Sequence, residues 1–146
     1  MTIRTMAAFR VRLTDWHADA ERLAAVRRAV FVDEQQVPEE LEWDGLDGAC
    51  AHALAEDATG SAIGTARLLP DGSVGRMAVL PAWRGRGVGS ALLATMLEVA
   101  RRRGDREVTL HAQTHACGFY EGHGFLRRGA EFLEAGIPHV AMARRL

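Results

Sequence analysis

A glycine-rich segment near the middle of the chain has residue types suited to binding a phosphate group. It follows an apolar stretch that ends at Pro81, and it opens an amphipathic stretch. Glycine allows positive φ angles and a close approach of the backbone to a ligand. The first N–H groups of a helix lack intrahelical partners and carry partial positive charge. We therefore predict a phosphate or pyrophosphate site with two added cations. Its residues are Arg84, Gly85, Arg86, Gly87, Val88, Gly89 and Ser90.

Two other phosphate-binding motifs fit this segment poorly. A P-loop needs Gly-Lys-Ser/Thr at the helix start, and the chain contains no lysine. A Rossmann fingerprint needs a third glycine where the chain has Ser90, and an acidic residue about 20 positions further on at a strand end. A plain strand-to-helix turn without a ligand is the remaining alternative.

The charges are unevenly distributed although the net charge is only -1, and this balance argues against a nucleic-acid partner. All 18 basic residues are arginines, and none lies between residues 33 and 47. That run carries Asp33, Glu34, Glu39, Glu40, Glu42, Asp44 and Asp47. We expect either a solvated acidic loop or a surface that attracts a cation.

The length and composition suit one domain spanning residues 1–146, with 48% hydrophobic residues for its core. No apolar run reaches the roughly 18–20 residues of a membrane span, and residues 1–12 lack the pattern of a signal peptide. These features predict a cytoplasmic protein without a membrane partner. We predict that Cys50 and Cys117 are reduced thiols. We also expect no metal site, because the sequence lacks the clustered spacing of metal ligands.

The hydrophobic periodicity predicts the order β-α-βββ-α-β-α-ββ around one mixed sheet, an α/β fold of the α+β sandwich type. The expected strands are 9–13, 51–56, 62–69, 73–80, 108–111, 125–133 and 140–143. The expected helices are 19–34, 88–103 and 115–121, with Asp15 or Asp19 as the first cap and Gly104 as the stop of the second helix.

Two motifs in this order resemble the GNAT superfamily of acetyltransferases. The run 84–89 matches the R/Q-x-x-G-x-G/A signature, and the run 119–125, Phe-Tyr-Glu-Gly-His-Gly-Phe, is similar to the family's F-Y-E-x-x-G-F segment. The element order matches from Phe9 to Leu146. The runs 28–35, 112–115 and 136–139 resemble the ElaA-like branch. The resemblance implies a mostly antiparallel mixed sheet flanked by helices, as in the GNAT fold.

The resemblance also implies that acetyl-CoA is the cosubstrate and that the acetyl group passes directly to a primary amine in a ternary complex. The run 84–90 would then hold the pyrophosphate of coenzyme A. The backbone of the preceding strand would hold the pantetheine arm and polarise the acetyl carbonyl. The implied coenzyme contacts before and after the turn are Met77, Ala78, Val79, Gln113, Phe119 and Tyr120. Gln113 stands where the family often has Asn.

Four side chains are candidates for proton transfer under this resemblance: Tyr120, Glu34, His111 and His139, of which His139 is preferred for acceptor binding. Tyr120 matches a family tyrosine that donates a proton to the leaving thiolate, with a core aromatic as the alternative. The base that some members carry on the strand before the turn does not transfer, because Gly75 and Arg76 stand there. Glu34 and His111 remain as bases, although a surface carboxylate and a satisfied core histidine are the plainer interpretations.

The acidic run borders the acceptor side in this fold, so we predict a cationic amine acceptor, either a small molecule or a peptide. Glu34 and His139 are the expected acceptor contacts. Two other classes stay open: a noncatalytic domain that senses acyl-CoA, and a Rossmann-type nucleotide binder. A homodimer is an expectation by analogy.

Overall fold

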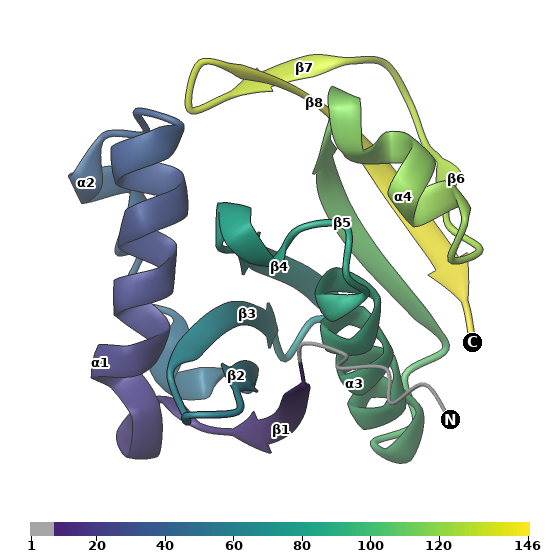
Figure 1. The fold of residues 1–146 in the computed structure, drawn as a ribbon. Helices are drawn as coiled ribbons and strands as arrows, with labels where there is room; N and C mark the ends of the chain where they lie inside the picture. The colour runs from purple at the N-terminus through teal and green to yellow at the C-terminus, as the bar shows by residue number, and fades with distance from the viewer. Residues whose placement is uncertain (1–7) are drawn as a thin grey trace, which may run out of the picture.

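The computed structural model describes residues 8–146, and it contains one eight-stranded mixed sheet (Figure 1). Residues 1–7 lie outside the described residues. They are part of the segment 1–12, which is predicted to lack a signal peptide. The strands are β1 Phe9–Thr14, β2 Ala51–Asp57, β3 Ala62–Leu68, β4 Ser73–Val79, β5 Glu107–Gln113, β6 Leu126–Arg127, β7 Phe132–Glu134 and β8 Ile137–Arg145. The sheet order is β1-β2-β3-β4-β5-β8-β6, and β7 also pairs with β8. This arrangement confirms the predicted fold class.

The helices lie around this sheet. They are α1 Trp16–Arg27, α2 Glu39–Glu42, α3 Val88–Arg102 and α4 Cys117–Glu121, with a π-helical segment η1 Arg28–Glu34 and the short 3-10 turns η2 Asp47–Ala49, η3 Pro81–Trp83 and η4 Thr114–Ala116. Both α1 and α3 contact β2, β3 and β4, and they cover opposite faces of these strands (Figure 1). No helix within residues 8–146 is both long and apolar enough to cross a membrane.

The first helix begins three residues earlier than predicted. The Asp15 side chain accepts a hydrogen bond from the Ala18 N–H at 2.8 Å, so Asp15 is the cap and Trp16 starts α1. Asp19 has non-helical backbone angles, and its carboxylate accepts hydrogen bonds from Arg12 and Thr14. Beyond residue 27 the helix continues in π-helical form to residue 34.

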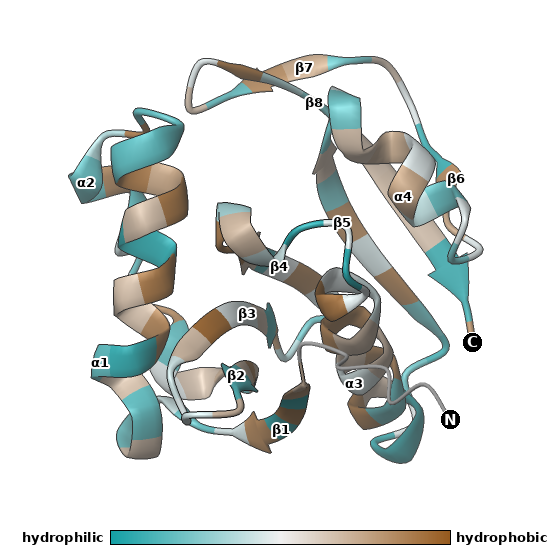
Figure 2. Cartoon of the chain, viewed as in Figure 1, coloured by the Kyte–Doolittle hydropathy of each residue, from teal (hydrophilic) through white to brown (hydrophobic). Residues whose placement is uncertain are grey.

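Two apolar clusters fix the helices to the sheet. The larger cluster joins α3 to the strands, and Gly64 leaves room there, since an added Cβ would lie 3.0 Å from Leu92. The smaller cluster joins Val26 and Val30 to Ala78 on β4. Figure 2 shows hydrophobic residues along the strands and mostly hydrophilic residues on α2. Both faces of β4 are therefore anchored, which fixes the position of this strand.

The sheet opens between its two central strands. The parallel pairing of β4 with β5 is limited to Ser73 with Thr109 and Val74 with Leu110. Beyond Val74 a bulge shifts the register between β3 and β4, with Arg76 at φ +49°. The Thr65 hydroxyl donates to the Arg76 carbonyl at 3.1 Å and so holds the bulge in place. From this point β4 and β5 diverge (Figure 1).

The prediction of a continuous strand over 125–133 is wrong. After α4, the strands that pair with β8 are the short β6 and β7, and Gly129 at φ +90° lies in the gap between them. The last strand, β8, is longer than the predicted 140–143. Ala135 and Gly136, both at positive φ, form the tight turn that joins β7 to β8. This hairpin leans over the opening in the sheet (Figure 1).

Candidate active site

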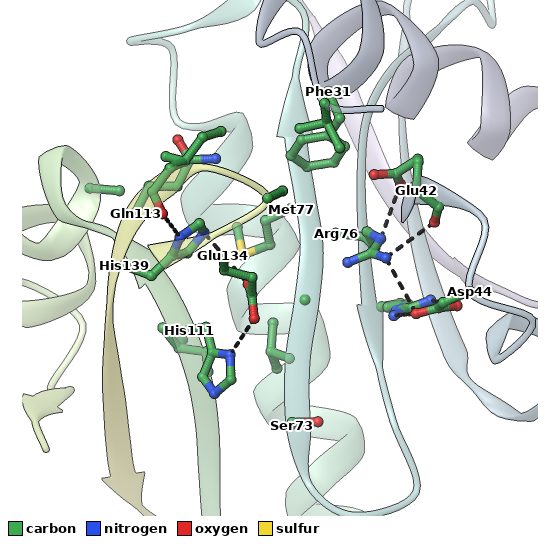
Figure 3. A pocket seen from close by; sticks show the side chains of 18 of the residues that line it. Phe31, Glu42, Asp44, Ser73, Arg76, Met77, His111, Gln113, Glu134 and His139 are labelled. Atoms are coloured by element: carbon green, nitrogen blue, oxygen red, sulfur yellow. Dashed lines mark hydrogen bonds and ion pairs between the residues drawn. The ribbon is translucent and has the colours of Figure 1, made fainter. Parts of the chain in front are cut away.

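A cavity of 740 Å³ lies at the opening between β4 and β5. Its walls come from η1 and the loop after it, from both strands, and from the β7–β8 hairpin (Figure 3). Among its lining side chains are Phe31, Arg76, Met77, His111, Gln113, Tyr120, Glu134 and His139. Four of the predicted catalytic or binding residues on separate elements, Met77, His111, Tyr120 and His139, therefore line one space.

The glycine-rich turn has the backbone conformation that the sequence predicts. Gly85 lies at φ +74° and Gly87 at φ +86°, and Gly87 is the N-cap of α3 without a side-chain capping bond. The first helical bond runs from the Ala91 N–H to the Gly87 carbonyl at 3.1 Å. Within residues 8–146, the six N–H groups from Gly85 to Ser90 donate to no protein acceptor. Such a row of free donors at a helix start suits a phosphate group.

The side chains around this turn already have protein partners. Arg84 makes a bidentate ion pair with Glu34, with Nη2 2.6 Å from Oε1, and its Nε donates to the Val79 carbonyl at 3.0 Å. Arg86 lies over the Trp83 ring, 5.1 Å from its centroid. Arg84 is thus paired with a carboxylate, whereas Arg86 keeps its charge over the Trp83 ring. The availability of both arginines as added cations for a phosphate stays a prediction. The backbone remains the main donor of the turn.

Phe119, a further predicted coenzyme residue, packs beside this turn. The Ser90 hydroxyl lies 3.0 Å from His123 Nε2, and an added Cβ at Gly89 would lie 3.5 Å from the Phe119 ring. The ring of Phe119 in turn contacts that of His123, with 4.9 Å between centroids. These contacts fix α4 against the start of α3.

Helix α4 carries Tyr120 to the edge of the cavity. The Tyr120 hydroxyl donates to the Met77 sulfur at 3.6 Å, so the two residues meet across the opening. Its ring packs edge-on against Phe119 and Phe125. Burial raises the pKa of Tyr120 to about 12, because the phenolate would lose its solvation. The phenol therefore stays protonated at neutral pH.

A carboxylate and two imidazoles line the opposite wall of the cavity. Glu134, on the β7–β8 hairpin, lies 2.9 Å from His111 Nδ1 through Oε1 and 3.6 Å from His139 Nε2 through Oε2 (Figure 3). The His111 side chain is 55% exposed, so the interpretation as a core histidine is wrong. His139 is buried, stacks on Phe132 and has Nδ1 2.6 Å from the Ile137 carbonyl. Nothing within residues 8–146 forms a metal-ligand group of three such side chains.

Sequence reasoning missed Glu134 as a functional residue and treated it as part of a turn. The available signal was an acidic side chain beside the tight Ala135-Gly136 turn, in a strand that precedes His139. Its partner His111 lies 23 residues earlier. Only the pairing of β7 and β5 with the same strand, β8, brings the two together.

Gln113 lines the cavity, whereas Glu34 is not among its lining residues. The Gln113 amide donates to Gln35 Oε1 at 2.8 Å, and this bond links the end of β5 to the segment after η1. Glu34 is the last residue of η1. The hydrogen bonds that it accepts from Arg84 lower the pKa of its carboxyl group. The structure therefore pairs Glu34 with the glycine-rich turn and not with the histidines.

The acidic run is largely neutralised by arginines from other elements. We call the buried part the arginine–carboxylate network. It consists of Arg27, Arg67, Arg76, Glu42, Asp44 and Asp47. Arg27 is 1% exposed, with Nε 2.8 Å from Glu42 and Nη1 2.6 Å from Asp47. Glu34 and Glu39 are also paired, with Arg84 and Arg28. The expected attraction of a cation by this run is thus corrected, because five of the seven carboxylates face an arginine.

Residues 17–146 match the family model of the acetyltransferase (GNAT) domain. The chain belongs to the GNAT acetyltransferase family. This GNAT chain is 37% identical over 123 residues to YjcF of Bacillus subtilis, which is named an uncharacterized N-acetyltransferase. The alignment covers 82% of this chain and 87% of YjcF. It is also 35% identical over 132 residues to the protein ElaA of Escherichia coli, covering 85% and 86% of the two chains.

Solved structures show the same relationship for this GNAT domain. The crystal structure of Escherichia coli ElaA matches with a TM-score of 0.83 at 30% identity, covering 94% of this chain and 100% of that one. An acyl-CoA N-acyltransferase from Pseudomonas aeruginosa matches with a TM-score of 0.81 at 33% identity, covering 94% and 99%. The predicted placement in the ElaA-like branch is confirmed.

Proposed function

We propose that this GNAT domain transfers the acetyl group of acetyl-CoA directly to an amine in a ternary complex. The observation that carries the proposal is the row of six free N–H groups from Gly85 to Ser90. It lies at the end of β4, the strand whose opening toward β5 leads to Tyr120 and the cavity. A pyrophosphate on these donors would direct the pantetheine arm along Met77, Ala78 and Val79.

Tyr120 has the position and protonation state to hydrogen-bond the departing thiolate. Full proton transfer from a phenol of pKa about 12 to a thiolate whose conjugate acid has a pKa of about 8.5 is uphill by roughly 5 kcal/mol. We therefore assign Tyr120 as a hydrogen-bond donor that stabilises charge on sulfur, while solvent or the released ammonium proton completes the thiol.

His111 is the best-placed base, with Glu134 as its positioning residue. A carboxylate only accepts hydrogen bonds, so the 2.9 Å contact makes Nδ1 of His111 the protonated nitrogen. The Nε2 lone pair of the neutral ring is then free to take a proton from the acceptor ammonium. Glu34 is less suited to this task, since Arg84 lowers the pKa of its carboxyl group.

The proposed reaction balances in atoms and charge. An ammonium loses one proton to His111, and the amine attacks the thioester carbonyl. The C–N bond forms and the C–S bond breaks, with a Met77–Val79 backbone N–H as donor to the carbonyl oxygen. The amide nitrogen loses its second proton and the thiolate takes up one, so one proton is released per amide formed.

The proposal is tested by coenzyme A calorimetry and by thiol release from acetyl-CoA with a panel of amines. We expect saturable coenzyme A binding and amine-dependent thiol release. In Tyr120→Phe, kcat falls about 10- to 100-fold, because a hydrogen bond to a charged group is lost, while coenzyme A affinity stays within about twofold. Binding without any thiol release would instead identify an acyl-CoA sensor. Absence of binding would refute both.

A further inference from the structure

The cavity has a cationic feature that the proposed acetyl transfer does not use. Arg76 lies on the bulge of β4 at φ +49°, a conformation that is uncommon for a residue other than glycine. Arg67, one strand away on β3, also lines the cavity. Backbone strain of this kind is retained where the surrounding structure fixes a side chain in a required direction. Arg76 lines the cavity, and Figure 3 shows its guanidinium beside Glu42 and Asp44, across β4 from His111 and Glu134.

Some guanidinium N–H groups on this side of the cavity have no acceptor among the described residues. Arg76 Nη2 donates to the carbonyls of Leu41 and Glu42 and to Asp44, and Nε lies 3.0 Å from Glu42 Oε2. Within the described residues no hydrogen bond of Arg76 uses Nη1, since its three side-chain hydrogen bonds all come from Nη2. The Nε atoms of Arg67 and Arg76 are buried and have no hydrogen-bond partner among these residues, although Arg76 Nε forms an ion pair with Glu42.

The network beneath this nitrogen carries no net charge. Its three arginines balance its three carboxylates. The arginine–carboxylate network therefore attracts a purely cationic acceptor only weakly. The free Nη1 donors of Arg76, in contrast, suit an oxyanion. These donors are separate from the pyrophosphate site, because no residue of the glycine-rich turn lines the cavity.

The opposite wall has the complementary chemistry. Glu134 is 49% exposed there and holds His111, so this side accepts protons and favours an ammonium group. The cavity thus presents a guanidinium donor on β4 and a carboxylate–imidazole pair on β5 and the β7–β8 hairpin. Met77, next to Arg76 in sequence, carries the backbone proposed to hold the thioester.

We propose that the acceptor is a small amino acid, an amine that also carries a carboxylate. Its carboxylate binds Arg76 Nη1, and its amine faces the His111–Glu134 pair. Arg76 is the residue that sets this specificity. The inference rests on the proposed acetyl transfer and names the substrate class for the same site.

The test compares α-, β- and γ-amino acids, each with its own carboxamide, as acceptors for the wild type, Arg76→Gln and Arg102→Gln. Arg76→Gln leaves Glu42 paired with Arg27 and Asp44 paired with Arg67, so we expect it to fold. Arg102, on α3, has a side chain that is 77% exposed and pairs with Glu98, so it is the matched control.

We expect the wild type to favour at least one amino acid over its carboxamide by tenfold or more in kcat/KM. The ratio falls to about one in Arg76→Gln and stays at the wild-type value in Arg102→Gln. Calorimetry with coenzyme A checks that the variants keep the cofactor site.

Other outcomes overturn the inference in distinguishable ways. Equal rates for acids and carboxamides, or an unchanged ratio in Arg76→Gln, refute the substrate class while acetyl transfer stands. Binding of acetyl-CoA without acetylation of any amino acid in the panel refutes it too. Failure of the wild type to bind coenzyme A refutes the proposed function, and the inference falls with it.

Discussion

The glycine-rich turn and the acidic run are both recognisable in the sequence, yet they differ in how far the sequence explains them. Within the described residues, the turn at 84–90 keeps its backbone N–H groups from Gly85 to Ser90 free, as expected from its glycines and the helix start. The run, residues 33–47, looks like an isolated block of negative charge but is paired with arginines from α1, β3 and β4. The free N–H groups of the turn follow from local backbone geometry. The charge state of the acidic run depends on arginines that are distant in sequence.

This difference teaches that a charge pattern predicts a surface field only when its partners are known. Arg67 is 20 residues from Asp47 in sequence, and Arg76 is 34 residues from Glu42. A backbone site has no such dependence, because the next few residues set its φ angles. The following predictions test each half of the comparison.

The largest effect is expected for Arg27→Met, in the arginine–carboxylate network. The substitution leaves Glu42 and Asp47, which are 3% and 5% exposed, without their shared buried partner. The free energy of unfolding should fall by about 3–5 kcal/mol. Urea denaturation followed by circular dichroism measures it, and Arg102→Met, with an exposed i,i+4 pair, should change it by less than about 0.5 kcal/mol. Similar values for both variants would mean that the network is a surface feature.

The network should also make the fold sensitive to acid. Hydrogen bonds from Arg67 hold the pKa of the Asp44 carboxyl group well below its usual range. A carboxyl group with a lowered pKa in the folded state stabilises the fold above its unfolded pKa of about 3.9 and loses this effect as pH falls further.

We therefore expect Asp44→Asn to lower the free energy of unfolding at pH 7 by roughly 2–3 kcal/mol. The difference from the wild type should shrink as pH decreases from 4 to 2. Unfolding curves at several pH values measure this trend. A difference that is constant from pH 7 to pH 2 would show that Asp44 contributes through packing and not through its charge.

In the turn, Gly85→Val is expected to weaken coenzyme A binding at least tenfold. Gly85 lies at φ +74°, where a β-branched residue is strained, so the N–H groups leave their positions. The matched control is Gly60→Val in the turn between β2 and β3, at φ +85° and likewise without neighbours within 4 Å of an added Cβ. Calorimetry should find wild-type affinity in the control. Equal losses in both variants would indicate a general loss of stability.

The smallest effect is expected for Arg84→Gln. The Arg84 guanidinium is already occupied by Glu34 and Val79, and its side chain is 43% exposed. We expect a loss of less than about fivefold in coenzyme A affinity. A loss larger than that of Gly85→Val would reverse the comparison, because the side chain would then exceed the backbone as the phosphate donor.

The same contrast explains which parts of the fold were predictable. The strands β2 and β3 and the helix α3 follow from alternation, helical spacing and glycine stops, which are local signals. The prediction missed the break between β6 and β7, because it joined the apolar pairs Phe125-Leu126 and Phe132-Leu133 into one strand across Gly129. The positions of Tyr120 and Met77 were predicted from motifs. For Glu134 the only local signal was its place beside the Ala135-Gly136 turn, which does not reveal its contact with His111.

By itself, the sequence determined the conformation of the glycine-rich turn, the family and most of the element order, because these depend on backbone preferences and short spacings. Only the tertiary structure decided which charges are free. It paired Glu34 with Arg84, buried Arg27 between two carboxylates, and left Nη1 of Arg76 without a hydrogen bond among the described residues. The physical reason is that an ion pair acts over a few ångströms in space, and strand pairing brings together residues that sequence distance keeps apart.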